Sequence, residues 1–127
     1  MVTKAEELAL YYARKYPLTF KREVSQSDIS LSERYEEAWK AAERAARILK
    51  ENYGAQKVAA FGSITRRPSF THWSDIDLAV WGIPDEKFYA AVGVVTGLTA
   101  DFKIDLVDIS GCKDSIRNAI ETEGVEI

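Results

Sequence analysis

Three short apolar runs constrain the fold of this chain most, because each is bounded or interrupted by residue types that strands usually avoid. The runs cover about 57–61, 75–81 and 101–109, and the first of them closes on Gly62 and Ser63. Short apolar runs bounded by glycine, serine and aspartate are typical of strands that end in turns. We therefore expect three strands, with a turn directly after the first.

Acidic residues lie within two of these runs, where acids are unusual. Asp75 and Asp77 open the second run, and the alternation of side chains along a strand places both on one face. Asp105 lies inside the third run. Two like charges about 4 Å apart repel by roughly 4 kcal/mol at an effective dielectric near 20, so converging acids need cations between them. Their hard oxygen ligands suit Mg²⁺, which predicts metal-assisted transfer of a phosphorus-containing group, with Asp75, Asp77 and Asp105 as metal ligands and catalytic residues.

Asp108 competes with Asp105 for the third place in this set. The two acids are three residues apart, so in a regular strand they face opposite sides of the sheet. Asp108 stands at the end of its run, before a Ser-Gly pair, and suits capping of a turn. We therefore choose Asp105, and expect it also to accept the proton from an attacking hydroxyl group. For Asp75 and Asp77 the alternative is a polar strand entry without function.

The turn after the first run suits an anion. Gly62 lets backbone N–H groups approach a phosphate closely, and Ser63 adds a hydroxyl donor. Arg66, in the polar loop 64–74, has a planar guanidinium that suits phosphate; the alternative is a solvated loop charge. We expect Gly62, Ser63 and Arg66 to bind the nucleotide, although a Gly-Ser pair is also compatible with a plain turn. Trp73, in the same loop, could stack on a base or anchor the loop on the core.

Helical patterns precede and alternate with the strands. Capping boxes predict helices over 3–16 and 30–53, and Gly54 follows the second helix as its C-terminal cap. Two further helices are expected, one from Pro84 onward and one over 113–123. This order predicts an α/β (α+β) fold with a small mixed sheet and helices packed on it.

Composition places the chain in a broad class. Its 127 residues predict a single domain, 1–127, with a helical N-terminal part at 1–55 and a catalytic αβ core at 56–127. A single cysteine favours a reducing cytoplasm, and no apolar run approaches the ~20 residues of a membrane helix. The net charge of −3 gives no reason to expect a nucleic-acid partner. One histidine, His72, is too few for a histidine metal cluster.

In order, the strand, the Gly-Ser pair, the arginine loop, Asp-x-Asp and a later acid resemble the nucleotidyltransferase superfamily that includes DNA polymerase beta. The stretch FGSITRRPSFTHWSDIDLAV is similar to the signature of its smallest branch, the minimal nucleotidyltransferases (MNT), and KIDLVDI resembles that branch's third-acid strand. The resemblance implies the polymerase-beta-like fold, here with an extra N-terminal helical region. Members of the family often read Gly-Ser-x-Ala-Arg-Gly; Thr65 and Arg67 depart from that pattern.

The resemblance also implies residue roles and a reaction. Gly62 and Ser63 would hold the triphosphate of ATP, and Asp75, Asp77 and Asp105 would bind two Mg²⁺ ions. The implied activity is that of an antitoxin that transfers AMP from ATP to a tyrosine of a partner HEPN toxin, in a homo- or hetero-oligomer. Two alternatives stay open: a non-catalytic antitoxin or regulatory module of the same fold, and a small-molecule nucleotidyltransferase of the aminoglycoside type.

Overall fold

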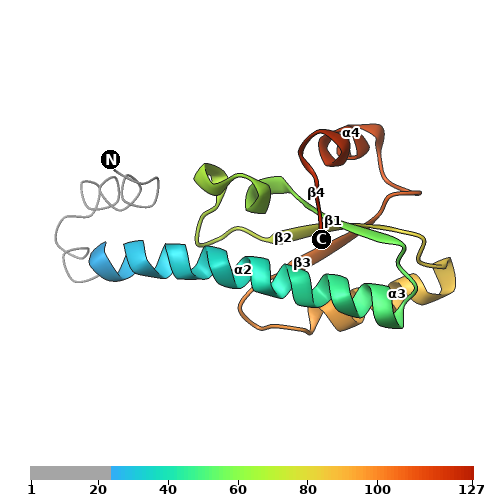
Figure 1. The fold of residues 1–127 in the computed structure, drawn as a ribbon, viewed down its shortest axis with the longest axis horizontal. Helices are drawn as coiled ribbons and strands as arrows, with labels where there is room; N and C mark the ends of the chain where they lie inside the picture. The colour runs from blue at the N-terminus through green and yellow to red at the C-terminus, as the bar shows by residue number, and fades with distance from the viewer. Residues whose placement is uncertain (1–23) are drawn as a thin grey trace.

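The structure, a computed structural model, describes residues 24–127 (Figure 1). Its helices, 3-10 helices (η) and strands are, in chain order, α2 (Val24–Asn52), β1 (Lys57–Phe61), η2 (Gly62–Thr65), η3 (Arg67–Ser69), β2 (Ile76–Trp81), α3 (Asp85–Thr96), β3 (Ile104–Asp108), α4 (Asp114–Glu123) and β4 (Val125–Glu126). The helix expected over 3–16 lies outside the described residues. Between 24 and 127, no helix combines the length and the apolar character that crossing a bilayer requires.

The four strands form one mixed sheet in the order β3-β2-β1-β4. Strand β1 runs antiparallel to both β2 and β4, whereas β2 and β3 are parallel. Helix α3 provides the crossover that a parallel pair requires. The expected mixed sheet is therefore confirmed, together with its three longer strands. The fourth strand was not expected, because a pair of exposed residues carries no periodic pattern.

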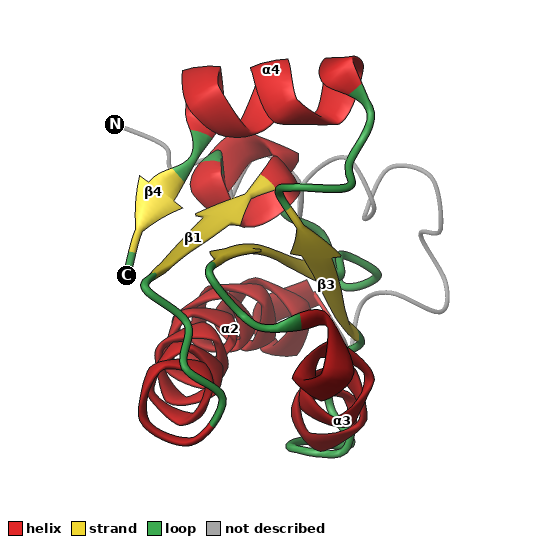
Figure 2. Ribbon diagram, turned by 90° about the vertical axis from the view of Figure 1, so that its right-hand side faces the viewer, coloured by secondary structure: helices red, strands yellow, loops and turns green. Residues whose placement is uncertain are grey.

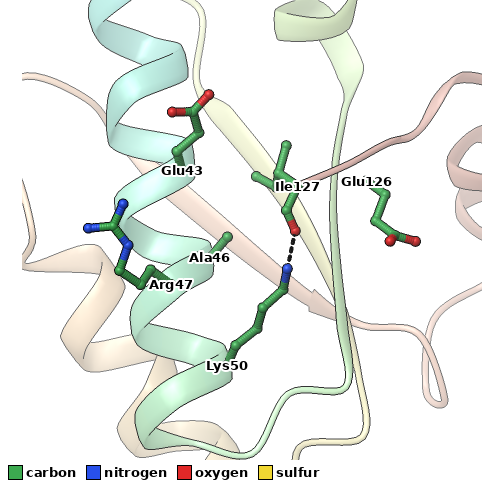
Figure 3. Close-up of a pocket in the computed structure, with 6 residues that line it drawn as sticks. All are labelled: Glu43, Ala46, Arg47, Lys50, Glu126 and Ile127. Atoms are coloured by element: carbon green, nitrogen blue, oxygen red, sulfur yellow. Dashed lines mark hydrogen bonds between the residues drawn. The ribbon is translucent and has the colours of Figure 1, made fainter.

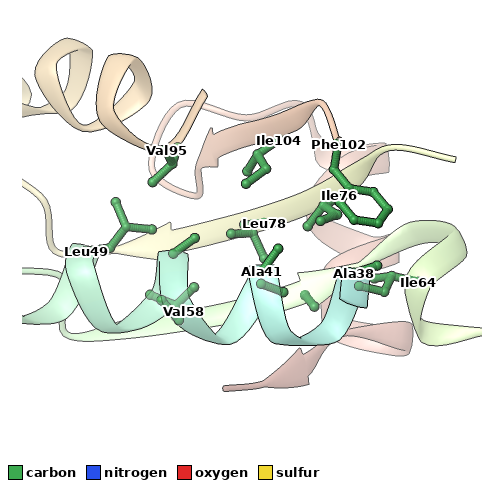
Figure 4. Packing of buried hydrophobic residues seen from close by; sticks show 14 of the residues in the cluster. Ala38, Ala41, Leu49, Val58, Ile64, Ile76, Leu78, Val95, Phe102 and Ile104 are labelled. Atoms are coloured by element: carbon green, nitrogen blue, oxygen red, sulfur yellow. The ribbon is translucent and has the colours of Figure 1, made fainter. Parts of the chain in front are cut away.

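The sheet is covered on both faces (Figure 2). Helices α2 and α3 lie on one face, and α4 lies on the other. Along β2, the side chains of Ile76, Leu78 and Val80 are fully buried and belong to the core between the sheet and α2 and α3 (Figure 4). Fully buried alanines on α2, among them Ala38 and Ala42, let that helix approach the sheet closely. Side chains at the odd-numbered positions of β2 consequently point to the face that carries α4.

The two ends of α2 differ in how well local sequence patterns predict them. Helix α2 begins at Val24, so the helix start expected at Ser30 is wrong. The capping-box pattern there is a local signal, and serine inside a helix costs only a few tenths of a kcal/mol, which tertiary packing of a long helix easily offsets. The end was read correctly: Gly54 follows α2 with φ +78, and the Ala55 N–H donates back to the Leu49 carbonyl at 3.1 Å.

Candidate active site

The strand register brings two of the three predicted acids side by side. Asp77 on β2 is the direct partner of Asp105 on the parallel strand β3, and of Phe61 on β1. The neighbours of both acids in their strands, Ile76 and Ile104, are buried in the core. Both acids therefore point to the opposite face of the sheet, where α4 lies. Asp75 precedes β2 by one residue and is close enough to act on the charge of Asp77.

Gly62 completes this arrangement from the end of β1. Its φ is +78, a backbone conformation that favours glycine. A Cβ atom added at Gly62 would lie 2.6 Å from Oδ2 of Asp77, closer than real Cβ contacts allow. The backbone of the turn therefore approaches the Asp77 carboxylate as closely as only a glycine permits. The predicted anion-binding turn and the predicted acids thus lie next to one another.

The acids form a local concentration of negative charge. The pKa of Asp77 is raised above its ordinary value, first by burial and then by the charges of Asp105 and Asp75. Lys103 opposes this effect, and its Nζ lies 3.7 Å from Oδ1 of Asp105. That ion pair is largely exposed, so water screens it and it offsets little of the repulsion. Ionised Asp77 is consequently costly in the folded chain.

Asp77→Asn is therefore expected to raise the free energy of unfolding at pH 7 in metal-free buffer. The folded-state pKa of Asp77 lies above the ordinary 3.8 that the unfolded chain retains. The native state thus holds this proton more readily, and stability is lost as the pH rises through the folded-state pKa. Asparagine removes that cost, so the advantage of the variant should disappear as the pH falls below 3.8. Urea unfolding in EDTA, at pH 7 and at a pH below 3.8, measures the difference in unfolding free energy between variant and wild type. A variant that is less stable than wild type at pH 7 would contradict the argument.

Asp108 lies at the end of β3, as expected from its place before a Ser-Gly pair. Its Oδ1 accepts hydrogen bonds from the N–H of Ser110 at 3.0 Å and from the Ser110 hydroxyl at 2.8 Å. The Asp108 carboxylate thus caps the turn that follows β3. Because it is three positions after Asp105, it faces the other side of the strand. Asp108 is a turn residue, which leaves Asp105 beside Asp77.

The Gly-Ser turn is a short 3-10 helix, η2, entered from an extended Phe61, and no side chain caps its start. Within it, the Thr65 hydroxyl donates to the Gly62 carbonyl at 2.7 Å, and the Arg66 N–H donates to the Ser63 carbonyl at 3.1 Å. These bonds fix the turn from inside. Thr65, which departs from the family pattern, therefore has a local structural role.

The two arginines of the loop have different surroundings. Arg66 donates from Nη2 to Oε1 of Glu123 on α4 at 2.9 Å, and its side chain is 63% exposed. Such an exposed ion pair contributes about 0–1 kcal/mol and leaves the guanidinium near solvent. Arg67 instead lies against α2, with its guanidinium 4.8 Å from the centre of the Tyr35 ring. Of the two, Arg66 is the one whose charge remains accessible to a ligand.

Trp73 lies in the loop that leads to Asp75 and is 77% exposed. It therefore does not anchor the loop on the core, which was one of its two readings; stacking on a base stays a prediction. The loop itself is held by Ser74, whose Oγ accepts the Thr71 N–H at 2.8 Å. The neighbouring His72 is partly buried, and burial, followed by the charge of Arg34, lowers the pKa of its imidazole. His72 is consequently neutral at pH 7.

Carboxylate oxygens from neighbouring strands are hard ligands, and as a donor set they fit Mg²⁺. Within residues 24–127, no group of three or more His, Cys, Asp or Glu side chains is arranged so that it could hold a metal ion. The metal assignment of Asp75, Asp77 and Asp105 thus stays a prediction. A hollow of about 490 Å³ lies in a different place, between α2 and β4 (Figure 3), and is lined by Glu43, Ala46, Arg47, Lys50, Glu126 and Ile127.

Comparison with known protein families finds a match over the part of the chain that contains the candidate site. Residues 43–127 match the family model described as polymerase beta, nucleotidyltransferase. This match covers η2, the three acids and the whole sheet. Among curated protein sequences, none matches this chain.

Solved structures share the fold at low sequence identity. The toxin-antitoxin MntA-HepT matches with 20% identity and a TM-score of 0.52, over 69% of this chain and 69% of that chain. A toxin-antitoxin with AMP-PNP matches with 21% identity and a TM-score of 0.56, over 67% and 70%. A tri-AMPylated Shewanella oneidensis HEPN toxin in complex with MNT antitoxin matches with 19% identity and a TM-score of 0.53, over 70% and 70%. At these identities the likeness shows the fold, whereas the family model covers well over half of the sequence. The chain belongs to the polymerase beta nucleotidyltransferase family.

Proposed function

We propose that this chain transfers AMP from ATP to a hydroxyl group, with Asp75, Asp77 and Asp105 as its catalytic carboxylates. The observation that carries the proposal is the pairing of Asp77 with Asp105 across parallel strands, with Gly62 against the Asp77 carboxylate. Membership of a nucleotidyltransferase family supports the reaction class. The proposed unit is a single domain, 1–127, whose α2 contributes to the same core as the sheet.

The residues divide the reaction between them. Gly62, Ser63 and Arg66 bind the phosphates, where backbone N–H groups, a hydroxyl and a guanidinium offer donors. Asp105 accepts the proton of the acceptor hydroxyl. A bond forms between that oxygen and the α-phosphorus, the bond from this phosphorus to the bridging oxygen breaks, and pyrophosphate leaves. Mg²⁺, when bound by the three acids, supplies positive charge that offsets the charge of the phosphate oxygens.

The acceptor is proposed to be a tyrosine of a HEPN-type toxin, which would make the chain an antitoxin acting by AMPylation. Support comes from fold neighbours described as toxin-antitoxin complexes, one of them with AMP-PNP and one with a tri-AMPylated HEPN toxin. We place the reaction in the cytoplasm, in a complex with that partner. The single cysteine of the chain is consistent with a reducing compartment.

Incubation with radiolabelled ATP, Mg²⁺ and a purified HEPN protein tests the proposal. We expect label on a tyrosine of the partner, located by mass spectrometry, and loss of labelling with EDTA. A parallel reaction offers aminoglycosides as acceptors. Label on these alone would favour the small-molecule alternative. If no acceptor is labelled and the chain still neutralises the toxin, the non-catalytic module is the correct description.

A further inference from the structure

One tyrosine of α2 makes three separate contacts to the segment that carries the Gly-Ser turn. The Tyr35 hydroxyl donates to the Ile64 carbonyl at 2.8 Å. The ring meets Phe70 edge to face, with 5.0 Å between ring centroids, and the Arg67 guanidinium lies 4.8 Å from its centre. Tyr35 thus contacts η2, η3 and the residue that follows η3. Among the side chains of residues 31–127, only that of Tyr35 is found to contact Ile64, Arg67 and Phe70 in these ways.

Helix α2 supports the contacted segment in addition to the hydrogen bonds inside the turn. Ile64 and Phe70 are fully buried, and Arg67 also donates from Nη2 to the Ser32 hydroxyl of α2 at 3.1 Å. Ile64 is the residue next to Ser63 in η2, so the Tyr35 hydrogen bond ends on the carbonyl adjacent to the proposed phosphate-binding residues. Movement of Tyr35 would therefore move the turn itself.

From this geometry we infer that Tyr35 is a positioning residue for nucleotide binding. Among residues 31–127 its polar and aromatic contacts are with Ile64, Trp39, Phe70 and Arg67 and not with the three acids. Through Ile64 it holds Gly62 and Ser63 where a triphosphate must meet them. The inference rests on the proposed function. Tyr35 lies before residue 43, where the match to the family model begins, so the part of α2 that precedes the match takes part in setting the site.

The hydrogen bond biases the turn toward one arrangement. Loss of an intramolecular hydrogen bond shifts a local equilibrium by a factor of roughly five. If the turn must be in the bound arrangement before ATP enters, the apparent dissociation constant rises as the competent fraction falls. Once ATP is bound, the same arrangement is restored and the chemical step is unchanged. A positioning role thus predicts weaker binding with an unaltered turnover number.

Tyr35→Phe tests this, because the variant keeps the ring and removes only the hydroxyl. We expect the dissociation constant of AMP-PNP and the KM for ATP to rise by up to about fivefold, with kcat within twofold of wild type. Hydrogen exchange at the amides of residues 62–66 should become faster in the absence of nucleotide. Calorimetric titration, steady-state kinetics and exchange mass spectrometry give these three values.

Tyr53→Phe is the matched control. Tyr53 is a partly buried tyrosine that packs against the core just beyond the C-terminal end of α2, and among residues 31–127 no hydrogen bond of its hydroxyl is found. This variant should leave AMP-PNP affinity and exchange at 62–66 unchanged. If Tyr35→Phe lowers only the melting temperature, with affinity and exchange as in wild type, Tyr35 is merely structural and the inference is overturned. If wild type binds no triphosphate, the proposed function fails, and the exchange rates alone then decide whether Tyr35 fixes the turn.

Discussion

Gly62→Ala is expected to reduce the rate of AMP transfer by about a hundredfold or more, while lowering stability only modestly. The new methyl group would lie 2.6 Å from Oδ2 of Asp77. That oxygen is the far end of a rotatable side chain, so the fold can relieve the clash by turning the carboxylate away. Relief of the clash therefore displaces the carboxylate proposed to be catalytic, and displacement of about 1 Å is enough for a loss of this size.

Gly54→Ala separates this effect from backbone strain. Gly54 and Gly62 share a φ of +78, so alanine at either position costs about 1–2 kcal/mol in the left-handed region. Around Gly54, however, nothing lies within 4 Å of the added Cβ. We expect similar losses of unfolding free energy for the two variants in urea titrations, and loss of transfer for Gly62→Ala alone. Equal activities would show that the close approach to Asp77 has no catalytic importance.

The parts of the fold that could be predicted are those that local patterns encode. The apolar run at 57–61 coincides with β1, and Gly54 ends the preceding helix. Strand β4 escaped prediction because its pairing comes from tertiary contact, including the hydrogen bond from the Ile127 N–H to the Val58 carbonyl at 2.9 Å. The start of α2 was misplaced because a capping box is a local preference, and the packing of a 29-residue helix on a sheet outweighs it.

In the candidate site, too, local patterns predict some features and tertiary contacts determine the others. Alternation along a strand was enough to predict that Asp105 and Asp108 face opposite sides. It could not give the register that sets Asp77 opposite Asp105, because pairing between β2 and β3 depends on the crossover through α3. Tyr35 was missed for a different reason. An aromatic residue on the apolar stripe of a helix has the pattern of any core residue, and only coordinates show that its hydroxyl reaches the Ile64 carbonyl.

Asp77→Asn and Asp105→Asn are each expected to lower the rate of AMP transfer by roughly a thousandfold. Both substitutions keep the size of the side chain and remove its charge and its capacity to accept a proton. Asp108→Asn is the control, because Asp108 lies on β3 like Asp105 but its carboxylate accepts hydrogen bonds from Ser110. Its activity should stay within a few-fold of wild type. Initial rates with radiolabelled ATP at saturating Mg²⁺ measure all three.

The expected stability of Asp77→Asn separates a loss of catalysis from a loss of folding. Asp77 is costly when ionised, since burial and the charges of Asp105 and Asp75 raise its pKa. The asparagine variant should thus be inactive and more stable, so unfolding cannot explain its loss of activity. If Asp77 and Asp105 act as one unit, the double variant should lose scarcely more activity than either single variant. Losses that multiply would instead mean that the two carboxylates work independently, and the paired site inferred from their register would be wrong.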